Sequence, residues 1–362
     1  MKNTIGAGSG SPVSAVSQAT KDIIDPSVIM FICSYDACEE TSKLLAEKYP
    51  EAQIMGLIGT GIANGKSDGS YLYVTALYND AKVVCGVIPN VSVCPVFYMK
   101  KIDEQLTSIG AKGDNTVVYE FTTGNEEVLV SSLNATLSRK GISLIGGTVF
   151  GAPEGKASVV AYNGKVYEDA CVYAIIKNNA GKVKVYKENI YQKGDRPYHY
   201  ATKVNVENRA LCELDGLNAA DVYSRELGIN KNQITDNVFE NPMGRVVGDE
   251  VFISSMKNVN SKGEIENYKV INRNDCIQIL ELGNYEEIEA RTREMIMHDF
   301  SKISLVLSVD CVYRYLMYSN KRYFNTYISD MARLGNHFGI VGGGEQYNNQ
   351  HVNQTMVCAV FE

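Results

Sequence analysis

Short apolar runs of strand length recur along the chain, separated by polar segments. In the first half these runs lie at residues 28–34, 52–59, 70–78, 81–89, 116–121 and 141–147, and residues 156–189 are predicted to form a meander of several strands. Segments with the apolar spacing of helices lie between some of them, at about 36–49, 95–109 and 125–139. Strands and helices therefore do not alternate strictly, and this pattern argues against a doubly wound parallel sheet.

Turn residues predict how several of these segments begin or are joined. Asp36 and Glu39 predict a capping box at the start of the first helix. Polar or small residue pairs at 79–80, 163–164 and 180–181 predict hairpins between consecutive strands.

The same kind of pattern restarts after a turn-rich segment at 191–200. A hairpin is predicted over 201–216, with its turn at 207–208. Further strands are predicted at 247–256, 265–272, 276–282, 303–311, 338–345 and 354–361, and helices at about 218–228, 284–301 and 323–334. In the helix over 284–301, the spacing predicts a buried stripe of Ile288, Met295, Ile296 and Phe300.

We therefore predict an α+β protein with two mixed, largely antiparallel sheets, flanking helices and two subdomains. Residues 1–24 are expected to form a loose N-terminal tail, because the first of them are small and polar. Residues 25–200 are expected to form an N-terminal domain, and residues 201–362 a C-terminal domain.

Composition narrows the possible functions and the location. The formal net charge is −7, with no basic run, whereas nucleic acids and anionic membranes attract clustered Lys and Arg. No apolar run approaches the roughly 18 residues of a membrane span, and the N-terminus lacks the apolar core of a signal peptide. Nine scattered Cys are typical of reduced thiols. These features predict a cytoplasmic protein without nucleic-acid binding or membrane insertion.

Motifs for nucleotide, metal or nucleophile chemistry are weak. Gly59, Gly61 and Gly65 follow a strand, but a turn and another strand come next, instead of the helix N-terminus that binds a pyrophosphate. The four His lack the spacing of metal ligands. Cys311, at a strand end, is a candidate hydrolase nucleophile without an identifiable acid–base partner. We expect a protein that is not an enzyme and has no metal or cofactor.

Two charged residues near the C-terminus follow apolar strands. Arg314 comes after the run at 303–311, and Glu345 comes after an apolar run and three Gly. A buried guanidinium requires a partner. Either the two residues pair with each other, or they line one pocket in which Arg314 binds a carboxylate and Glu345 accepts from an ammonium group. The spacing alone leaves both interpretations open.

The strings DCVYRYLM (310–317) and GIVGGGEQYNNQHVNQTMVCAVF (339–361) resemble the C-terminal half of FIST domains (F-box and intracellular signal transduction). That half carries a Cys-x-x-Arg after a buried strand, then a Gly-Glu pair, then an Asn-x-Thr at the last strand. The resemblance covers about residues 28–361. It implies a ligand-binding set of Cys311, Arg314, Gly344, Glu345, Asn353 and Thr355. We add His351, which lies in the same cluster.

Two departures from the family pattern affect the N-terminal half. The segment at 56–65 is apolar and uncharged where the family often has a polar turn with an acid, and the acid after the Gly-Gly turn is missing from 146–153. We therefore expect the ligand contacts in the C-terminal half. Since both strands before Cys311 and Glu345 are apolar, they are expected to be adjacent and central, so that Arg314 and Glu345 meet at one edge with Asn353 and Thr355.

The resemblance implies a sensory protein that binds a small ligand such as an amino acid or a related metabolite. It would act through a separate signalling protein, such as a chemotaxis receptor, a histidine kinase or a cyclic-di-nucleotide enzyme. One alternative is a haem-binding nitric-oxide sensor, for which His351 or His337 would be the axial ligand. Another alternative is a protein-interaction platform without a small ligand.

Overall fold

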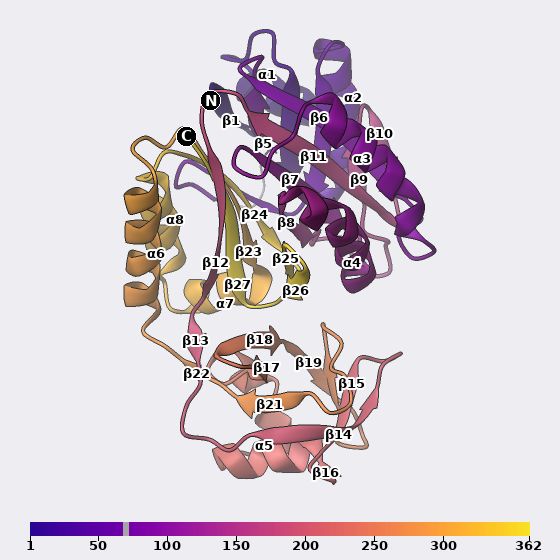
Figure 1. The fold of residues 1–362 in the computed structure, drawn as a ribbon, viewed down its shortest axis with the longest axis vertical. Helices are drawn as coiled ribbons and strands as arrows, with labels where there is room; N and C mark the ends of the chain where they lie inside the picture. The colour runs from indigo at the N-terminus through magenta and orange to yellow at the C-terminus, as the bar shows by residue number, and fades with distance from the viewer. Residues whose placement is uncertain (68–71) are drawn as a thin grey trace. The chain divides into compact units, whose positions relative to one another are not determined.

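The computed structural model describes residues 1–67 and 72–362, and within these it has two compact units (Figure 1). The first unit comprises residues 1–187, 293–351 and 356–362. The second unit comprises residues 188–292 and 352–355. This division differs from the expected boundary at residue 200, because the chain returns to the first unit at residue 293.

Three sheets form in the described part of the first unit. Their orders are β1-β5-β2-β3-β9-β10, β26-β25-β8-β7-β11-β6 and β12-β27-β23-β24-β4. The strands are β1 (Asn3–Gly8), β2 (Val28–Cys33), β3 (Gln53–Ile58), β4 (Thr60–Ala63), β5 (Leu72–Leu77), β6 (Ala81–Pro89), β7 (Thr116–Thr122), β8 (Ser143–Thr148), β9 (Val160–Tyr162), β10 (Lys165–Tyr167), β11 (Ala170–Asn178), β12 (Val183–Asn189), β23 (Leu305–Cys311), β24 (Asn336–Gly342), β25 (Glu345–Tyr347), β26 (Gln350–Val352) and β27 (Thr355–Phe361).

Each of these sheets contains a parallel strand pair joined through helices. β2 pairs with β3 across α2 (Cys38–Lys48), and β7 pairs with β8 across α4 (Glu126–Leu137). β23 pairs with β24 across α7 (Val312–Asn320) and α8 (Phe324–Ala332). Parallel pairing needs such a crossover, and it brings the carboxyl ends of both strands to one edge.

The strand that follows each parallel pair joins a different sheet. β4 follows β3 but pairs with β24, and β9 follows β8 but pairs with β3. β25 follows β24 but pairs with β8. Each parallel pair is therefore flanked by a strand from a distant part of the chain.

An apolar core lies between the second sheet and two helices, α3 (Met99–Ser108) and α4, which Figure 1 shows side by side. Strands β7 and β8 contribute Val118 and Leu144, and the helices contribute Ile102, Leu129 and Leu133. The helical spacing of the latter residues places them on one face of each helix.

The second unit contains an antiparallel sheet and one flanking helix among its described residues. The strand order is β18-β17-β21-β14-β15-β20-β19, with β16 beside β15. These are β14 (His199–Asn205), β15 (Ala210–Leu214), β16 (Leu217–Asn218), β17 (Met243–Val247), β18 (Glu250–Ser254), β19 (Met256–Val259), β20 (Ile265–Asn267) and β21 (Cys276–Ile279). Helix α5 (Ala219–Leu227) begins after the capping residue Asn218 and ends at Gly228, whose φ is 67°. Strands β13 (Tyr191–Gln192) and β22 (Glu281–Leu282) form a separate pair.

The α+β fold class predicted from the sequence is confirmed. The chain has mixed and antiparallel sheets with flanking helices, divided between two units. The expected loose tail at 1–24 is wrong. Strand β1 pairs with β5, and α1 (Pro12–Ala19) is capped by Ser11. The tail is ordered because its small residues fit closely: a side chain on Gly6 or Gly8 would collide with the backbone of α1.

Two of the predicted hairpins are also wrong. β5 pairs with β1 and β2, whereas β6 pairs with β11. β11 in turn pairs with β6 and β7, whereas β12 belongs to another sheet. The turn at 163–164 closes a hairpin between β9 and β10, and the predicted turn at 207–208 closes the hairpin of β14 and β15. Residues 70–71 of the strand predicted at 70–78 lie outside the described residues.

Smaller corrections concern the helices. The helix predicted at 36–49 begins with a 3₁₀ turn over 35–37, and no side-chain capping box is present there. In α6 (Tyr285–Asp299), Ile296 is buried, but Met295 is largely exposed. The sequence analysis missed α7, which starts immediately after β23.

We predict that all nine thiols are free. Titration of the denatured, unreduced protein should give close to nine thiols, because each Cys is free in the described chain. In the native protein, Cys94 and Cys276 should react first, since the other seven are buried. The variant Cys94→Ser/Cys276→Ser should lose this fast phase. Five or fewer thiols in the denatured wild type would contradict the prediction.

Candidate functional site

Arg314 lies in the first turn of α7, directly after β23, and its side chain is 0% exposed. Its Nε is 3.6 Å from Asp310 Oδ1, four residues earlier, on β23. Its guanidinium also lies over the rings of Tyr318 and Tyr327, 5.1 and 5.0 Å from their centroids. A carboxylate and two aromatic faces thus compensate the buried charge and hold the guanidinium in place.

Asp310 connects this arginine to a buried polar group on the same sheet. Tyr327 donates from its hydroxyl to Asp310 Oδ1 at 2.8 Å. Ser308, two residues earlier on β23, has its Oγ 2.8 Å from His337 Nε2 on β24. Gly339 makes room for this contact, because a side chain there would meet Ser308 Oγ. Burial lowers the pKa of His337 to about 4, so the imidazole is neutral at pH 7.

Glu345 begins β25, where it pairs with Gly147 of β8, and it is 0% exposed. The segment before it approaches the end of β8 closely. The amide of Thr148 donates to Gly344 O, and the amide of Gly343 donates to Thr148 O. Glycine at these positions permits the two backbones to come together.

The predicted adjacency of the two apolar strands is confirmed. β23 and β24 are parallel neighbours, and Cys311 pairs with Gly342 at their carboxyl ends. Arg314 therefore follows one of these ends. Gly344 and Glu345 follow the other.

The remaining predicted residues divide between the two units. His351 is buried in the first unit, with its Nδ1 3.3 Å from Gln346 Nε2. Asn353 and Thr355 belong to the second unit, where Asn353 Oδ1 accepts from the amide of Ser255 at 3.3 Å. The convergence of the whole set on one pocket stays a prediction.

Sequence reasoning missed the residues that hold Arg314. Asp310 precedes it by four residues, and Tyr318 follows it by four. Within α7 this spacing places Tyr318 on the same helical face as Arg314, so it was a usable signal once α7 was recognised, whereas Asp310 lies on β23, outside the helix. Tyr327 comes from α8, and no local pattern links it to Arg314.

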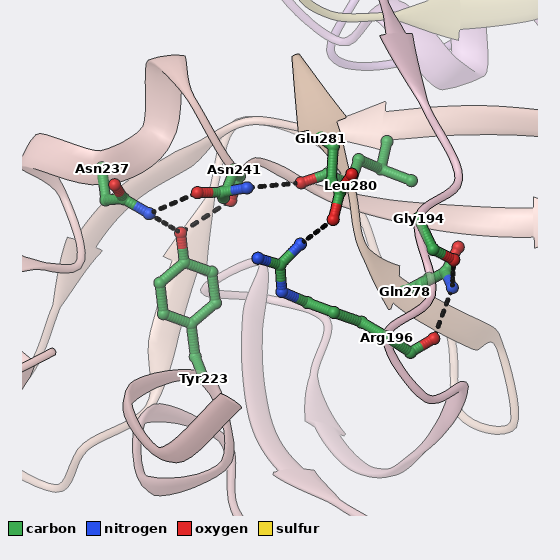
Figure 2. Close-up of polar contacts among 8 residues, drawn as sticks. All are labelled: Gly194, Arg196, Tyr223, Asn237, Asn241, Gln278, Leu280 and Glu281. Carbon is green, nitrogen blue, oxygen red and sulfur yellow. Dashed lines mark hydrogen bonds and ion pairs between the residues drawn. The ribbon is translucent and has the colours of Figure 1, made fainter. Parts of the chain in front are cut away.

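A second polar network lies within the second unit (Figure 2). The hydroxyl of Tyr223 on α5 donates to Asn241 O at 2.6 Å, and the Asn237 amide donates to the same hydroxyl at 3.2 Å. Arg196 donates to Glu281 at 2.6 Å. The first two contacts join α5 to the irregular segment at 234–242, and the third joins Arg196 to β22. We interpret all three as structural.

The structure also bears on whether the chain could bind a metal ion or span a membrane. Within the ranges that the structure covers, no group of three or more His, Cys, Asp and Glu is placed to hold a metal ion. No described helix is both long and apolar enough to cross a lipid bilayer.

Comparisons with known proteins match the chain to a family. The FIST N domain model matches residues 27–217, and the FIST C domain model matches residues 219–348. No curated protein matches. A solved cyanuric acid hydrolase, described as an evolutionary innovation by structural concatenation, is 10% identical with a TM-score of 0.36, covering 99% of this chain and 98% of that chain. Another, from A. caulinodans, is 7% identical with a TM-score of 0.35 over the same shares. Such scores are too low to support an argument.

We predict that His337 makes the protein less stable in acid. Its pKa is about 4 when folded and about 6.5 when unfolded. The unfolded chain therefore binds a proton first as the pH falls from 6.5 to 4, and the free energy of unfolding should drop by roughly 3 kcal/mol across that window. Urea denaturation at several pH values measures this drop.

The variant His337→Gln should no longer show this drop in the free energy of unfolding between pH 6.5 and 4. This holds even if the substitution also changes the stability at pH 7. The matched change His298→Gln, at an exposed position, should keep it. Equal pH profiles for His337→Gln and the wild type would contradict the assignment.

Proposed function

Because the chain belongs to the FIST family of sensory domains in signal transduction, we propose that it is a cytoplasmic sensor for an amino-acid-like metabolite. The observation that carries the proposal is the fully buried Arg314 at the carboxyl end of β23, next to the parallel strand that leads to the fully buried Glu345. A guanidinium binds a carboxylate through two parallel hydrogen bonds. A carboxylate accepts from an ammonium group, and an α-amino acid offers both groups.

The surroundings of Arg314 support a binding role. Asp310 and two tyrosine rings fix the orientation of the guanidinium, and a fixed binding group loses less entropy when a ligand arrives.

We also include His351, which lies in the first unit with Arg314 and Glu345, in this ligand-binding set, because an imidazole can donate or accept a hydrogen bond. Cys311 is 2% exposed, which supports a packing role rather than a nucleophilic one, and we propose that the protein is not an enzyme. The output passes to a separate signalling protein, such as a chemotaxis receptor or a histidine kinase.

A thermal-shift screen over the twenty amino acids and related metabolites tests the proposal. A ligand at 100 times its Kd adds about 2.7 kcal/mol of stability, which raises Tm by a few degrees in a protein of this size. The hit should lose its effect when its carboxylate is removed, as in the corresponding amine, and when its ammonium group is removed. A hit that needs neither group would contradict the proposed chemistry.

A further inference from the structure

The second sheet has three parallel strands whose carboxyl ends share one edge. β7 runs parallel to β8, and both β6 and β7 run antiparallel to β11. The strands β6, β7 and β8 therefore end together at Pro89, Thr122 and Thr148. In sheets of this kind ligands bind outside the carboxyl ends of the strands. Arg314 lies beyond the ends of β23 and β24 in another sheet, although the end of β8 contacts the segment after β24 through Thr148 and Gly344.

A row of directly paired residues crosses this sheet just inside the edge. Tyr173, Glu120, Gly146 and Gln346 pair in turn on β11, β7, β8 and β25. Paired residues of neighbouring strands point to the same face. Since Gly146 has no side chain, the carboxyl group of Glu120 lies over it: a Cβ at Gly146 would be 2.8 Å from Glu120 Oε1.

Two buried acceptor atoms in this row lack a donor. Glu120 and Gln346 are both 0% exposed, and within the described chain their Oε1 atoms have no hydrogen-bond partner. The second polar atom of each side chain does make a hydrogen bond. Cys171 Sγ donates to Glu120 Oε2 at 3.4 Å, and Gln346 Nε2 donates to Thr148 Oγ1 at 3.4 Å. Buried acceptors are normally satisfied. The proton of a neutral Glu120 can serve one of these two atoms, whereas an ammonium group, with three N–H donors, can serve both once that proton has been released.

A second carboxyl group lies beside the row and makes it electronegative. Glu126, the first residue of α4, is buried and accepts from Thr148 Oγ1 at 3.0 Å. Burial raises the pKa of Glu120 to about 8; the Cys171 hydrogen bond opposes the rise, and the nearby Glu126 adds to it. A bound cation would offset both burial and repulsion.

Large apolar side chains are exposed on the segments that leave the same edge. Val93 and Phe97 follow β6, Val128 lies in the first turn of α4, and Phe150 follows β8. These side chains offer apolar surface to a ligand at this edge, and small-molecule sites combine such surface with a few polar groups.

We propose that this edge is a second small-molecule site, which binds the primary ammonium group of an amine between Glu120 and Gln346. The ammonium donates to the Oε1 atoms of both residues. Its apolar substituent lies along the rim formed by Val93, Phe97 and Val128. The two proposed sites use different binding groups, but they adjoin, because Gln346 follows Glu345 in the chain and its Nε2 lies 3.3 Å from His351 Nδ1. Substitution of Glu120, which belongs to the second site alone, distinguishes them.

Calorimetry with n-hexylamine tests the proposal directly. n-Hexylamine should bind, whereas n-hexanol and hexanoate, which share its chain but lack the ammonium group, should not. At pH 7 Glu120 is mostly protonated, so the binding of an ammonium should release close to one proton, seen as a dependence of the heat on the ionisation enthalpy of the buffer. The other titratable groups near the row are Cys171, Tyr173, Glu126 and His351; burial raises the pKa of both Cys171 and Tyr173.

The variant Glu120→Gln should weaken hexylamine binding about 30-fold or more and abolish the proton release. The same change at the exposed Glu104 on α3 should leave both unaltered. The proposal is overturned if hexylamine and hexanol bind alike, if no proton is released by the wild type, or if folded Glu120→Gln binds as the wild type does.

Discussion

The parallel strand pairs of the first unit cannot complete their hydrogen bonds locally. A buried strand edge leaves amide and carbonyl groups without partners, at a cost that folded proteins avoid. Here β3, β8 and β24 each gain an antiparallel neighbour that follows a different pair in the chain: β9, β25 and β4 respectively. None of the three pairs is therefore complete until another part of the unit has folded, so we expect the unit to unfold as one body.

The same exchange determines where polar groups meet in the first unit. A strand that leaves one sheet for another must turn at a carboxyl end, and glycines such as Gly146, Gly147 and the run 342–344 lie at these ends. Close backbone approach at such a turn, as between Gly344 and Thr148, leaves no room for side chains. The side chains that remain come from the adjacent strand ends and helix starts. Arg314 and Glu120 are both placed in this way, on two different sheets.

The sequence predicted most strands and helices, because apolar runs and helical spacing are local signals. It also predicted that β23 and β24 are adjacent, since both are apolar throughout. The hairpins at 79–80 and 180–181 were wrong because a turn signal says nothing about the partner that a strand finds far along the chain. The contacts of Arg314 with Asp310 and Tyr318 were not predicted, because α7 was not recognised. Glu120 was also overlooked, although a Glu within the apolar run at 116–121 indicates a buried polar site.

Calorimetry on Arg314→Lys with the ligand found by screening tests the central claim, that Arg314 binds a carboxylate, most directly. Lysine keeps the charge but loses the two parallel donors, so Kd should rise at least about 30-fold if a desolvated carboxylate loses its clamp. The same change at the exposed Arg333 should leave Kd unchanged. If folded Arg314→Lys binds the ligand as tightly as the wild type, then Arg314 serves only to compensate Asp310 and the account is wrong.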